Sequence, residues 1–241
     1  MITLYGWGPM FDCPSPSSFV MKSLIQLQML GVEFELAVAD LEAVPKMKAP
    51  YLVDNGTLIE DTNFIRWHLE NKLGKSLDHG LSVAEAATGW ALERMAEDNV
   101  VNNILAQRWL KDDNFHKGPG LFFMGVPEAQ RKAVTDEVRG GIKAYMHGQG
   151  FGRHSEAEQL ELADRDITAI ANFLGDKDYL FGDAPAAADA GVAAVLISAA
   201  SEFFDTPLSG LVRRHENLVE YITRMEARYL TGHNWPVPEM A

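Results

Sequence analysis

Apolar residues recur along this chain in two different periods, and the change between them divides it into two parts. Near the N-terminus, residues 2–7 and 33–38 alternate in the manner of β-strands, and residues 51–53 and 57–60 flank an Asp-Asn-Gly turn that closes a hairpin. Between the first two strands, residues 19–30 place apolar side chains at helical spacing, and Gly31 ends the run as a C-terminal cap. A second helix is predicted over residues 64–73.

From residue 82 onward almost nothing in the pattern indicates a strand. Two capping boxes, Ser82 with Glu85 and Ser155 with Glu158, begin helices that we expect to run to about residues 111 and 174. Further helices are predicted over residues 127–147, 187–204, 207–214 and 217–229. The pattern therefore predicts an α/β domain with a thioredoxin-like order of elements over residues 1–76, a linker over residues 74–80, and an all-α helical bundle over residues 82–241.

Composition and net charge limit which kinds of molecule this protein is expected to bind and where it is expected to be located. The chain has 241 residues, of which 47% are hydrophobic, enough for two modest cores. Its 21 basic and 34 acidic residues give a net charge of −13, which argues against nucleic acid or an anionic membrane surface as partner. The N-terminus lacks a signal-peptide pattern, and no window approaches the roughly 18 apolar residues of a membrane span. We therefore expect a cytoplasmic protein.

One cysteine, Cys13, excludes an intrachain disulfide and a cysteine-based zinc cluster. Residues 147–154 contain two histidines among glycines, but no acidic or cysteine partner stands at ligand spacing, and the glycines do not follow a strand. We expect an ordered loop there, and no metal site.

The residues around Pro50 carry the strongest functional signal. Proline can begin a strand but cannot donate to a central ladder, so Pro50 marks a loop that enters the sheet. A cis bond before it would turn the backbone groups of Ala49 outward, where an extended peptide can pair with them. Asp61 and Thr62 stand at the start of the next helix, where free N–H groups and the helix dipole favour a carboxylate. These features predict a site for a small anionic peptide.

This arrangement resembles the glutathione-binding half of the glutathione transferase family. The positions in register are Pro50, Gly56, Ile59, Asp61, Thr62, Ile65, His68 and Leu69. Asp61 replaces the commoner Glu or Gln, and Thr62 replaces Ser, so an acceptor and a hydroxyl are both kept. An ordinary hairpin followed by a capped helix would account for the short motif alone, but the order of the two domains extends the resemblance over nearly the whole chain. The resemblance implies the glutathione transferase fold, a homodimer, and glutathione as co-substrate, bound by Ala49, Pro50, Asp61 and Thr62.

Parts of the helical half are similar to the failed-axon-connections and metaxin-related branch of this family: residues 122–127, residues 147–154, and residues 173–177 with 180–183. In the family, the helix that follows the last of these begins with Ser or Thr and carries Asp three residues later. Here Asp189 is present, but the capping position is Ala186, and a lost side-chain cap costs about 1 kcal/mol if nothing replaces it. We expect Asp189 to be structural rather than catalytic.

Ser17 is the residue that matches the family's thiol-activating Ser or Cys. A serine hydroxyl at a helix N-terminus can donate to a thiolate, and the helix dipole adds positive potential, so both lower the pKa of a thiol. Ser17 or Ser18 would also serve simply as the N-cap. Cys13 is separated from the helix by two prolines and Tyr5 lies inside a strand, so we expect an unreactive loop thiol and a packing residue.

The leading hypothesis is an enzyme in which Ser17 steadies the glutathione thiolate while it attacks an apolar electrophile or a peroxide. An apolar pocket for the second substrate would lie between the domains, walled by Trp7, Phe11, Phe115, Phe122 and Phe123. The alternative is a metaxin-like, non-catalytic protein-interaction module that kept the fold and lost the thiol chemistry. A glutathione-dependent reductase would require Cys at position 17.

Overall fold

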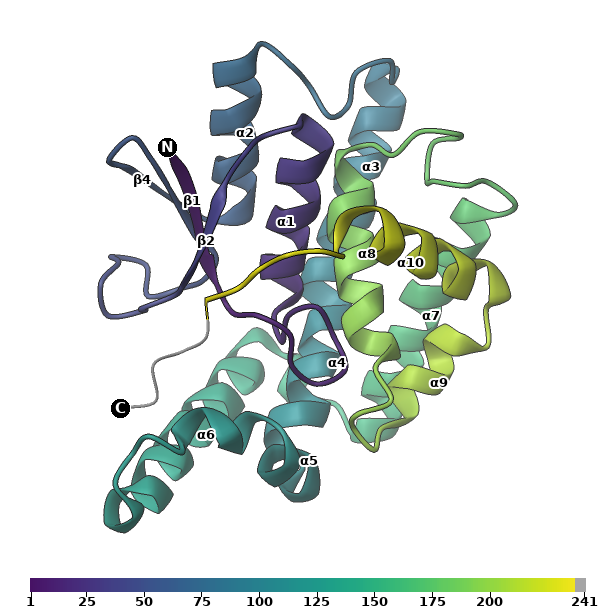
Figure 1. Ribbon diagram of the computed structural model, residues 1–241. Helices are drawn as coiled ribbons and strands as arrows, with labels where there is room; N and C mark the ends of the chain where they lie inside the picture. The colour runs from purple at the N-terminus through teal and green to yellow at the C-terminus, as the bar shows by residue number, and fades with distance from the viewer. Residues whose placement is uncertain (237–241) are drawn as a thin grey trace.

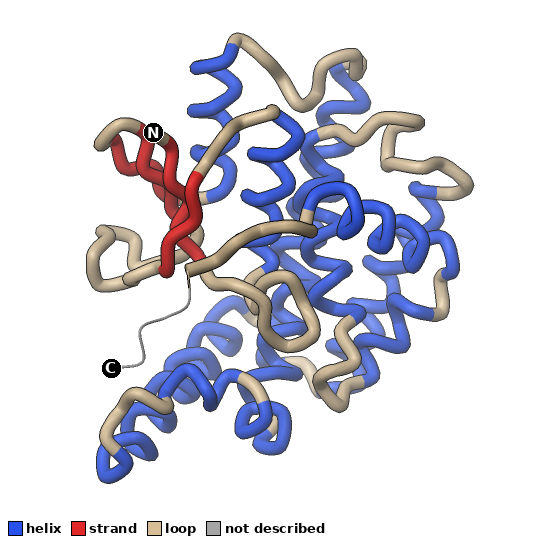
Figure 2. The backbone as a smooth tube through the Cα atoms, in the orientation of Figure 1, coloured by secondary structure: helices blue, strands red, loops and turns tan. Residues whose placement is uncertain are grey.

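The structure is a computed structural model that describes residues 1–236. A small sheet stands at one side of the molecule, and helices make up the rest (Figure 1 and Figure 2). In chain order the elements are β1 (Ile2–Gly6), α1 (Ser18–Leu30), β2 (Glu35–Val38), β3 (Tyr51–Asp54), β4 (Thr57–Glu60), α2 (Thr62–Leu73), α3 (Val83–Met95), η1 (Ala96–Val100), α4 (Val101–Leu105), η2 (Ala106–Leu110), α5 (Asp112–Lys117), η3 (Pro119–Phe123), α6 (Glu128–Gln149), η4 (Phe151–Arg153), α7 (Glu156–Leu174), α8 (Ala187–Ala200), α9 (Pro207–Arg213) and α10 (Glu216–Tyr229).

The sheet has the strand order β2-β1-β3-β4, in which β1 and β2 are parallel and the other pairs are antiparallel. Leu4 of β1 lies beside Leu36 on one side and Leu52 on the other. The β3–β4 turn places Asn55 and Gly56 at φ 48° and 86°, the left-handed conformations that an Asn-Gly hairpin turn requires. The predicted order of strands and helices in the first part of the chain is confirmed.

The predicted long helix from residue 82 to about residue 111 is confirmed, but it is not uniform. It begins at α3 with the expected Ser82–Glu85 capping box and continues through η1, α4 and η2. The segments η1 and η2 are π-helical, and such turns are frequent at functional sites because the wider turn shifts the side chains that follow. The pattern of apolar residues gave no sign of these two turns.

Two helix boundaries differ from the prediction. The helix expected over residues 187–204 ends at Ala200, because Ser201 leaves helical geometry and its hydroxyl donates to the carbonyl oxygen of Phe11 at 2.7 Å. The interhelical loop expected over residues 147–154 is shorter than predicted, since α6 continues through Gln149 and η4 follows it. The short helices α5 and η3 were not predicted.

The helix α8 is the centre of the helical part. All its residues are buried, and it packs against α1 and α3 as well as α9 and α10 (Figure 1). Because α1 belongs to the sheet part, the buried apolar residues of both parts form one continuous cluster. Within residues 1–236, no helix combines the length and the apolar character that a bilayer crossing requires.

Asp189 stabilises the start of α8 through hydrogen bonds, as expected of a structural residue. Its buried carboxylate accepts from the backbone N–H groups of Ala186 at 2.8 Å and Leu180 at 3.0 Å, and from the Tyr221 hydroxyl at 2.9 Å. Ala186 itself offers no side-chain acceptor. Burial raises the pKa of Asp189 to about 6, although these hydrogen bonds favour the carboxylate.

Candidate active site

A cavity of about 890 Å³ lies where the loop before β3, the start of α2 and the π-helical segment η1 meet. Four residues that the sequence singled out line it: Ala49, Pro50, Asp61 and Thr62. The peptide bond between Ala49 and Pro50 is cis. The tertiary structure therefore brings the loop proline and the acid-hydroxyl pair to one cavity.

Asp61 is the N-cap of α2. Its carboxylate accepts the backbone N–H of Asn63 at 2.9 Å, and the residue has φ 84°, a conformation that non-glycine residues rarely adopt. Strained conformations of this kind cluster at ligand sites, where the surrounding structure holds them in place. Thr62, the first residue of the helix, is buried at the cavity wall. An anion at this point would meet the free N–H groups of the first helical turn.

A buried group of charged residues lies beside the cavity, and two of its members, Arg94 and Glu97, line it. Lys22 Nζ lies 2.5 Å from Glu93 Oε1 and 2.7 Å from Glu97 Oε1, and donates to Asn63 Oδ1 at 3.0 Å. Arg94 forms ion pairs with both glutamates. Burial raises the pKa of Glu97, and the neighbouring Lys22 and Arg94 charges oppose that rise. The group ties α1, α2 and η1 together beside the site.

Ser17 lines a second cavity of about 610 Å³. The two cavities share part of their walls, including Trp7, Phe19 and Leu105. Ser17 is the N-cap of α1, where its Oγ accepts the backbone N–H of Val20 at 3.4 Å. A hydroxyl that accepts one hydrogen bond still has its own proton to donate, so this cap is compatible with a bound thiolate.

The residues that the sequence offered as rivals of Ser17 have other surroundings. Tyr5 stacks on Tyr51 with ring centroids 4.5 Å apart, and neither cavity is lined by it. Cys13 is buried, and its backbone pairs with Met10. Burial raises the pKa of the Cys13 thiol, which makes it a poor nucleophile. Ser18 also lines the second cavity, but its hydroxyl donates to Ser198 of α8 at 3.2 Å, and the N-cap of α1 is Ser17.

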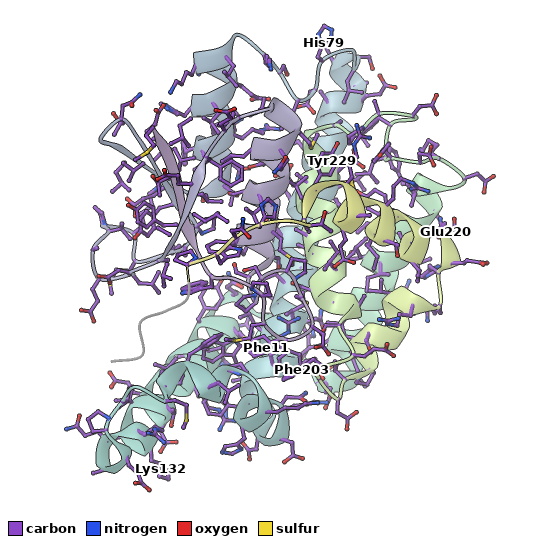
Figure 3. The ribbon with its side chains drawn as sticks, viewed as in Figure 1. Phe11, His79, Lys132, Phe203, Glu220 and Tyr229 are labelled. Carbon is purple, nitrogen blue, oxygen red and sulfur yellow. The ribbon has the colours of Figure 1, made fainter. Side chains whose placement is uncertain are left out.

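The second cavity has mostly aromatic and aliphatic walls. Four of the five aromatic residues predicted for such a pocket line it: Trp7, Phe11, Phe122 and Phe123. The prediction was wrong for Phe115, which is buried and packs on Trp109 and Phe123 behind the wall. Phe11 continues into an aromatic cluster with Phe203, whose ring centroid is 5.3 Å away (Figure 3).

Several polar residues at the first cavity were missed from sequence. They are Lys46, Lys48, Asn63, Arg94, Glu97, Tyr145 and Gln149. One signal was available: Lys22 interrupts the apolar face of α1, and Glu93 and Glu97 stand four residues apart on the helix with the capping box. A lysine on an apolar face requires a buried acidic partner. Within the described residues 1–236, no group of three or more His, Cys, Asp or Glu side chains is arranged to hold a metal ion.

Comparison with known families gives two matches. Residues 18–114 match the family described as glutathione S-transferase N-terminal domain, and residues 163–225 match the one described as glutathione S-transferase, C-terminal domain. The chain is also 34% identical over 242 residues to an isoprene-epoxide glutathione S-transferase from Rhodococcus sp. strain AD45. That alignment covers 95% of this chain and 99% of the relative.

Solved structures are similar in fold. A beta-etherase from Sphingobium sp. strain SYK-6 superposes with a TM-score of 0.68 at 16% identity, covering 95% of this chain and 96% of that one. A glutathione S-transferase from Methylobacterium radiotolerans, solved in complex with glutathione sulfonate, superposes with a TM-score of 0.61 at 20% identity, covering 100% and 99%. These likenesses confirm the predicted fold class of a thioredoxin-like part followed by an all-α part.

Proposed function

Because the chain belongs to the glutathione S-transferase family, we propose that it binds reduced glutathione in the cavity of about 890 Å³ and transfers the thiolate to an apolar electrophile in the neighbouring cavity of about 610 Å³. The observation that carries the proposal is the arrangement of the two cavities. One is the more polar of the two and is lined by Ala49, Pro50, Asp61 and Thr62, and the other is apolar and lined by Ser17.

The polar cavity suits the γ-glutamyl end of glutathione, which carries both an ammonium and a carboxylate. The Thr62 hydroxyl and the free N–H groups at the start of α2 would bind the carboxylate, and the Asp61 carboxylate would bind the ammonium. The backbone of Ala49 would pair with the cysteinyl residue in the manner of an added strand. The tripeptide would then extend from α2 toward α1.

Ser17 lines the cavity of about 610 Å³, where it would donate its free hydroxyl proton to a thiolate that extends past the shared wall residues Trp7, Phe19 and Leu105. The N-terminus of α1 adds positive potential at the same point, and both effects lower the pKa of the bound thiol. The sulfur then forms a bond to the electrophilic carbon of the second substrate, and the leaving group departs with the electron pair. A peroxide is the second candidate for the electrophile.

The Rhodococcus relative is named for an epoxide substrate, which supports a carbon electrophile for this chain. The metaxin-like, non-catalytic alternative has no support from the matched families or from this relative. Membership of the failed-axon-connections and metaxin-related branch stays a prediction, and so does a cytoplasmic location.

We also propose a homodimer, as the family resemblance implied. Phe64, Trp67 and Trp90 form an aromatic ridge on α2 and α3, with exposed fractions of 53%, 38% and 42%. Neighbouring ring centroids in the ridge are 5.3 Å and 6.2 Å apart. A contiguous exposed aromatic group of this kind favours association with another protein surface.

Calorimetric titration of reduced glutathione, with ultraviolet detection of the bound thiolate, tests the site. We expect the wild-type protein to bind glutathione and to show the thiolate signal, and Ser17→Ala to bind it without that signal. Ser18→Ala is the matched control, since Ser18 is already committed to Ser198 and its loss should leave the thiolate in place. Absence of binding at millimolar glutathione would remove the proposed function.

A further inference from the structure

Arg108 is a buried cation at the wall of the apolar cavity. Its side chain comes from the π-helical segment η2, and the residue is only 6% exposed. Among the described residues that line this cavity, it is the only charged one. A cation in such surroundings is costly unless an anion or strong acceptors compensate it.

The contacts of Arg108 are all with neutral groups. Nη2 donates to the carbonyl oxygen of Ser198 at 2.5 Å and Nη1 donates to that of Pro16 at 3.4 Å. The guanidinium carbon lies 4.7 Å from the centroid of the Phe204 ring. No carboxylate of residues 1–236 forms an ion pair with it, and burial lowers its pKa, although an arginine stays protonated at neutral pH.

The other deeply buried cations of the described chain do have acidic partners. Lys22 is held by Glu93 and Glu97, and Arg66 faces Glu70 and Asp78. The one group beside Arg108 that can ionise is Cys13, and burial raises the pKa of that thiol, so it is neutral at physiological pH. The charge of Arg108 is therefore left without a counter-ion in the described part of the protein.

We propose that Arg108 stabilises an oxyanion that forms on the second substrate, so that this site takes apolar electrophiles whose carbon–oxygen bond breaks under attack by the thiolate. This inference rests on the proposed function. In the step, the sulfur electron pair forms the C–S bond, the C–O electron pair moves onto oxygen, and the resulting alkoxide takes a proton from water. Nothing is oxidised or reduced, and an epoxide is the simplest substrate of this class.

The position of Arg108 fits that role. Its hydrogen bond to the carbonyl of Pro16 holds the guanidinium beside the loop that ends at Ser17, the proposed hydrogen-bond donor to the thiolate. Guanidinium has five N–H donors; two bond to the carbonyls and one to the Cys13 thiol, so donors remain for an oxygen anion. Preorganised donors aimed at a developing oxyanion in a water-poor cavity are among the strongest contributions to catalysis.

A binding experiment on the wild-type protein tests the anion preference directly. With S-methylglutathione in the first cavity, benzoate and benzamide are titrated by calorimetry, because the two have nearly the same shape and differ in charge. We expect benzoate to bind at least ten times more tightly than benzamide, even though the net charge of −13 on the protein repels an anion. Equal binding, or tighter binding of benzamide, would overturn the inference and leave the proposed function intact.

Turnover of two substrates of similar size gives the second test: styrene oxide, which yields an alkoxide, and benzyl iodide, whose leaving group needs no hydrogen-bond donor. We expect Arg108→Met to lower kcat/KM for styrene oxide by about 100-fold or more and for benzyl iodide by less than about tenfold. Arg139→Met is the matched control. Arg139 also lies over an aromatic ring, Phe115, and donates to carbonyl oxygens of η2, but it pairs with Asp112 and lines neither cavity.

The outcomes separate the two proposals. Equal losses for both substrates would mean that Arg108 only clamps Pro16 and Ser198, and turnover of benzyl iodide without styrene oxide by the wild type would mean that no oxyanion is stabilised. Either result overturns the inference alone. Failure of the wild type to bind glutathione would instead remove the proposed function on which the inference rests.

Discussion

Ser17 accepts the backbone N–H of Val20 and keeps its own hydroxyl proton, so helix capping and thiolate stabilisation are compatible in one residue. Asp61 also combines helix capping with a position at a cavity: one of its carboxylate oxygens caps α2, and the residue lines the polar cavity. From sequence, capping and ligand binding stood as alternatives at Ser17. In the structure, each of these side chains has capacity for both.

For Asp61 the two contributions can be separated by substitution. Asp61→Ala removes the cap and the charge together, so we expect the free energy of unfolding to fall by about 1 kcal/mol and glutathione affinity to fall at least about tenfold. Asp61→Asn keeps an acceptor and tolerates positive φ, so stability should stay within about 0.5 kcal/mol of the wild type while affinity still falls. Calorimetry and urea unfolding measure both quantities. Unchanged affinity in Asp61→Ala would rule out the proposed role.

At the scale of elements, α8 packs so closely against the segment α3–η1 that one position on it excludes a side chain. A Cβ atom at Gly191 would lie 2.7 Å from Glu93 Cγ and 2.9 Å from Glu97 Oε1. These glutamates pair with the buried Lys22, and Glu97 also lines the polar cavity. The helix contact and the site are therefore coupled through a buried ion group.

Substitution of this glycine tests the coupling. We expect Gly191→Ala to destabilise the protein by about 1–3 kcal/mol, because the ion group must shift to admit the methyl group. Gly210→Ala on α9 is the control, since no atom lies within 4 Å of its added Cβ, and it should be neutral or stabilising by up to about 1 kcal/mol. Urea unfolding compares the two. Similar effects at both positions would contradict the close approach.

The start of α8 should also give the protein a pH-dependent stability. The pKa of Asp189 rises from 3.8 to about 6 on folding, so the folded state holds this proton more tightly and stability falls as pH rises between those values. The difference corresponds to about 3 kcal/mol. Asp189→Asn lacks the titration, so the substitution should cost about 2.5 kcal/mol more near pH 4 than near pH 7.

Urea unfolding of the wild type and Asp189→Asn at both pH values measures this difference. Asp176→Asn removes an exposed carboxylate from the same part of the chain and should show no such dependence. A cost of Asp189→Asn that is the same at both pH values would mean that the buried carboxylate does not titrate as stated.

At the scale of the whole molecule, the sheet part and the helical part share one apolar cluster, chiefly through α1 and α8. The backbone N–H of Ala187 also donates to Asp78 Oδ1 at 3.2 Å, which joins the segment between the parts to the start of α8. The two cavities draw residues from both parts, so the two parts must stay in contact for the proposed site to exist. The division into domains at residues 1–76 and 82–241 stays a prediction.

The proposed dimer belongs to this scale. Sedimentation of the wild type should give about twice the chain mass of 26.7 kDa, and Trp67→Glu should reduce it to the mass of one chain, because a carboxylate in the middle of the aromatic ridge cannot be buried unpaired. Leu162→Glu alters an exposed apolar residue of α7, outside the ridge, and should leave the dimer intact. A wild-type mass of one chain would exclude the homodimer.

The sequence by itself determined the order and type of most elements, because strand alternation, helical spacing, capping boxes and the Asn-Gly turn are all local signals. It also identified the loop proline, the capping acid and the serine that the structure places at two adjoining cavities. These residues could be found because they belong to a motif in which several residue types recur at fixed spacing. The local signals failed at residues 201–204, where a contact with Phe11 ends the helix early.

Only the tertiary structure decided which side chains meet. The Lys22–Glu93 pair joins residues 71 positions apart, and the Arg108–Ser198 hydrogen bond joins residues 90 positions apart. The same holds for the burial of Arg108 without a counter-ion, since it depends on how α8 and the first loop pack against the long helix. A periodic pattern predicts that a residue faces the core. Which side chain it contacts there depends on how elements distant in the chain pack together.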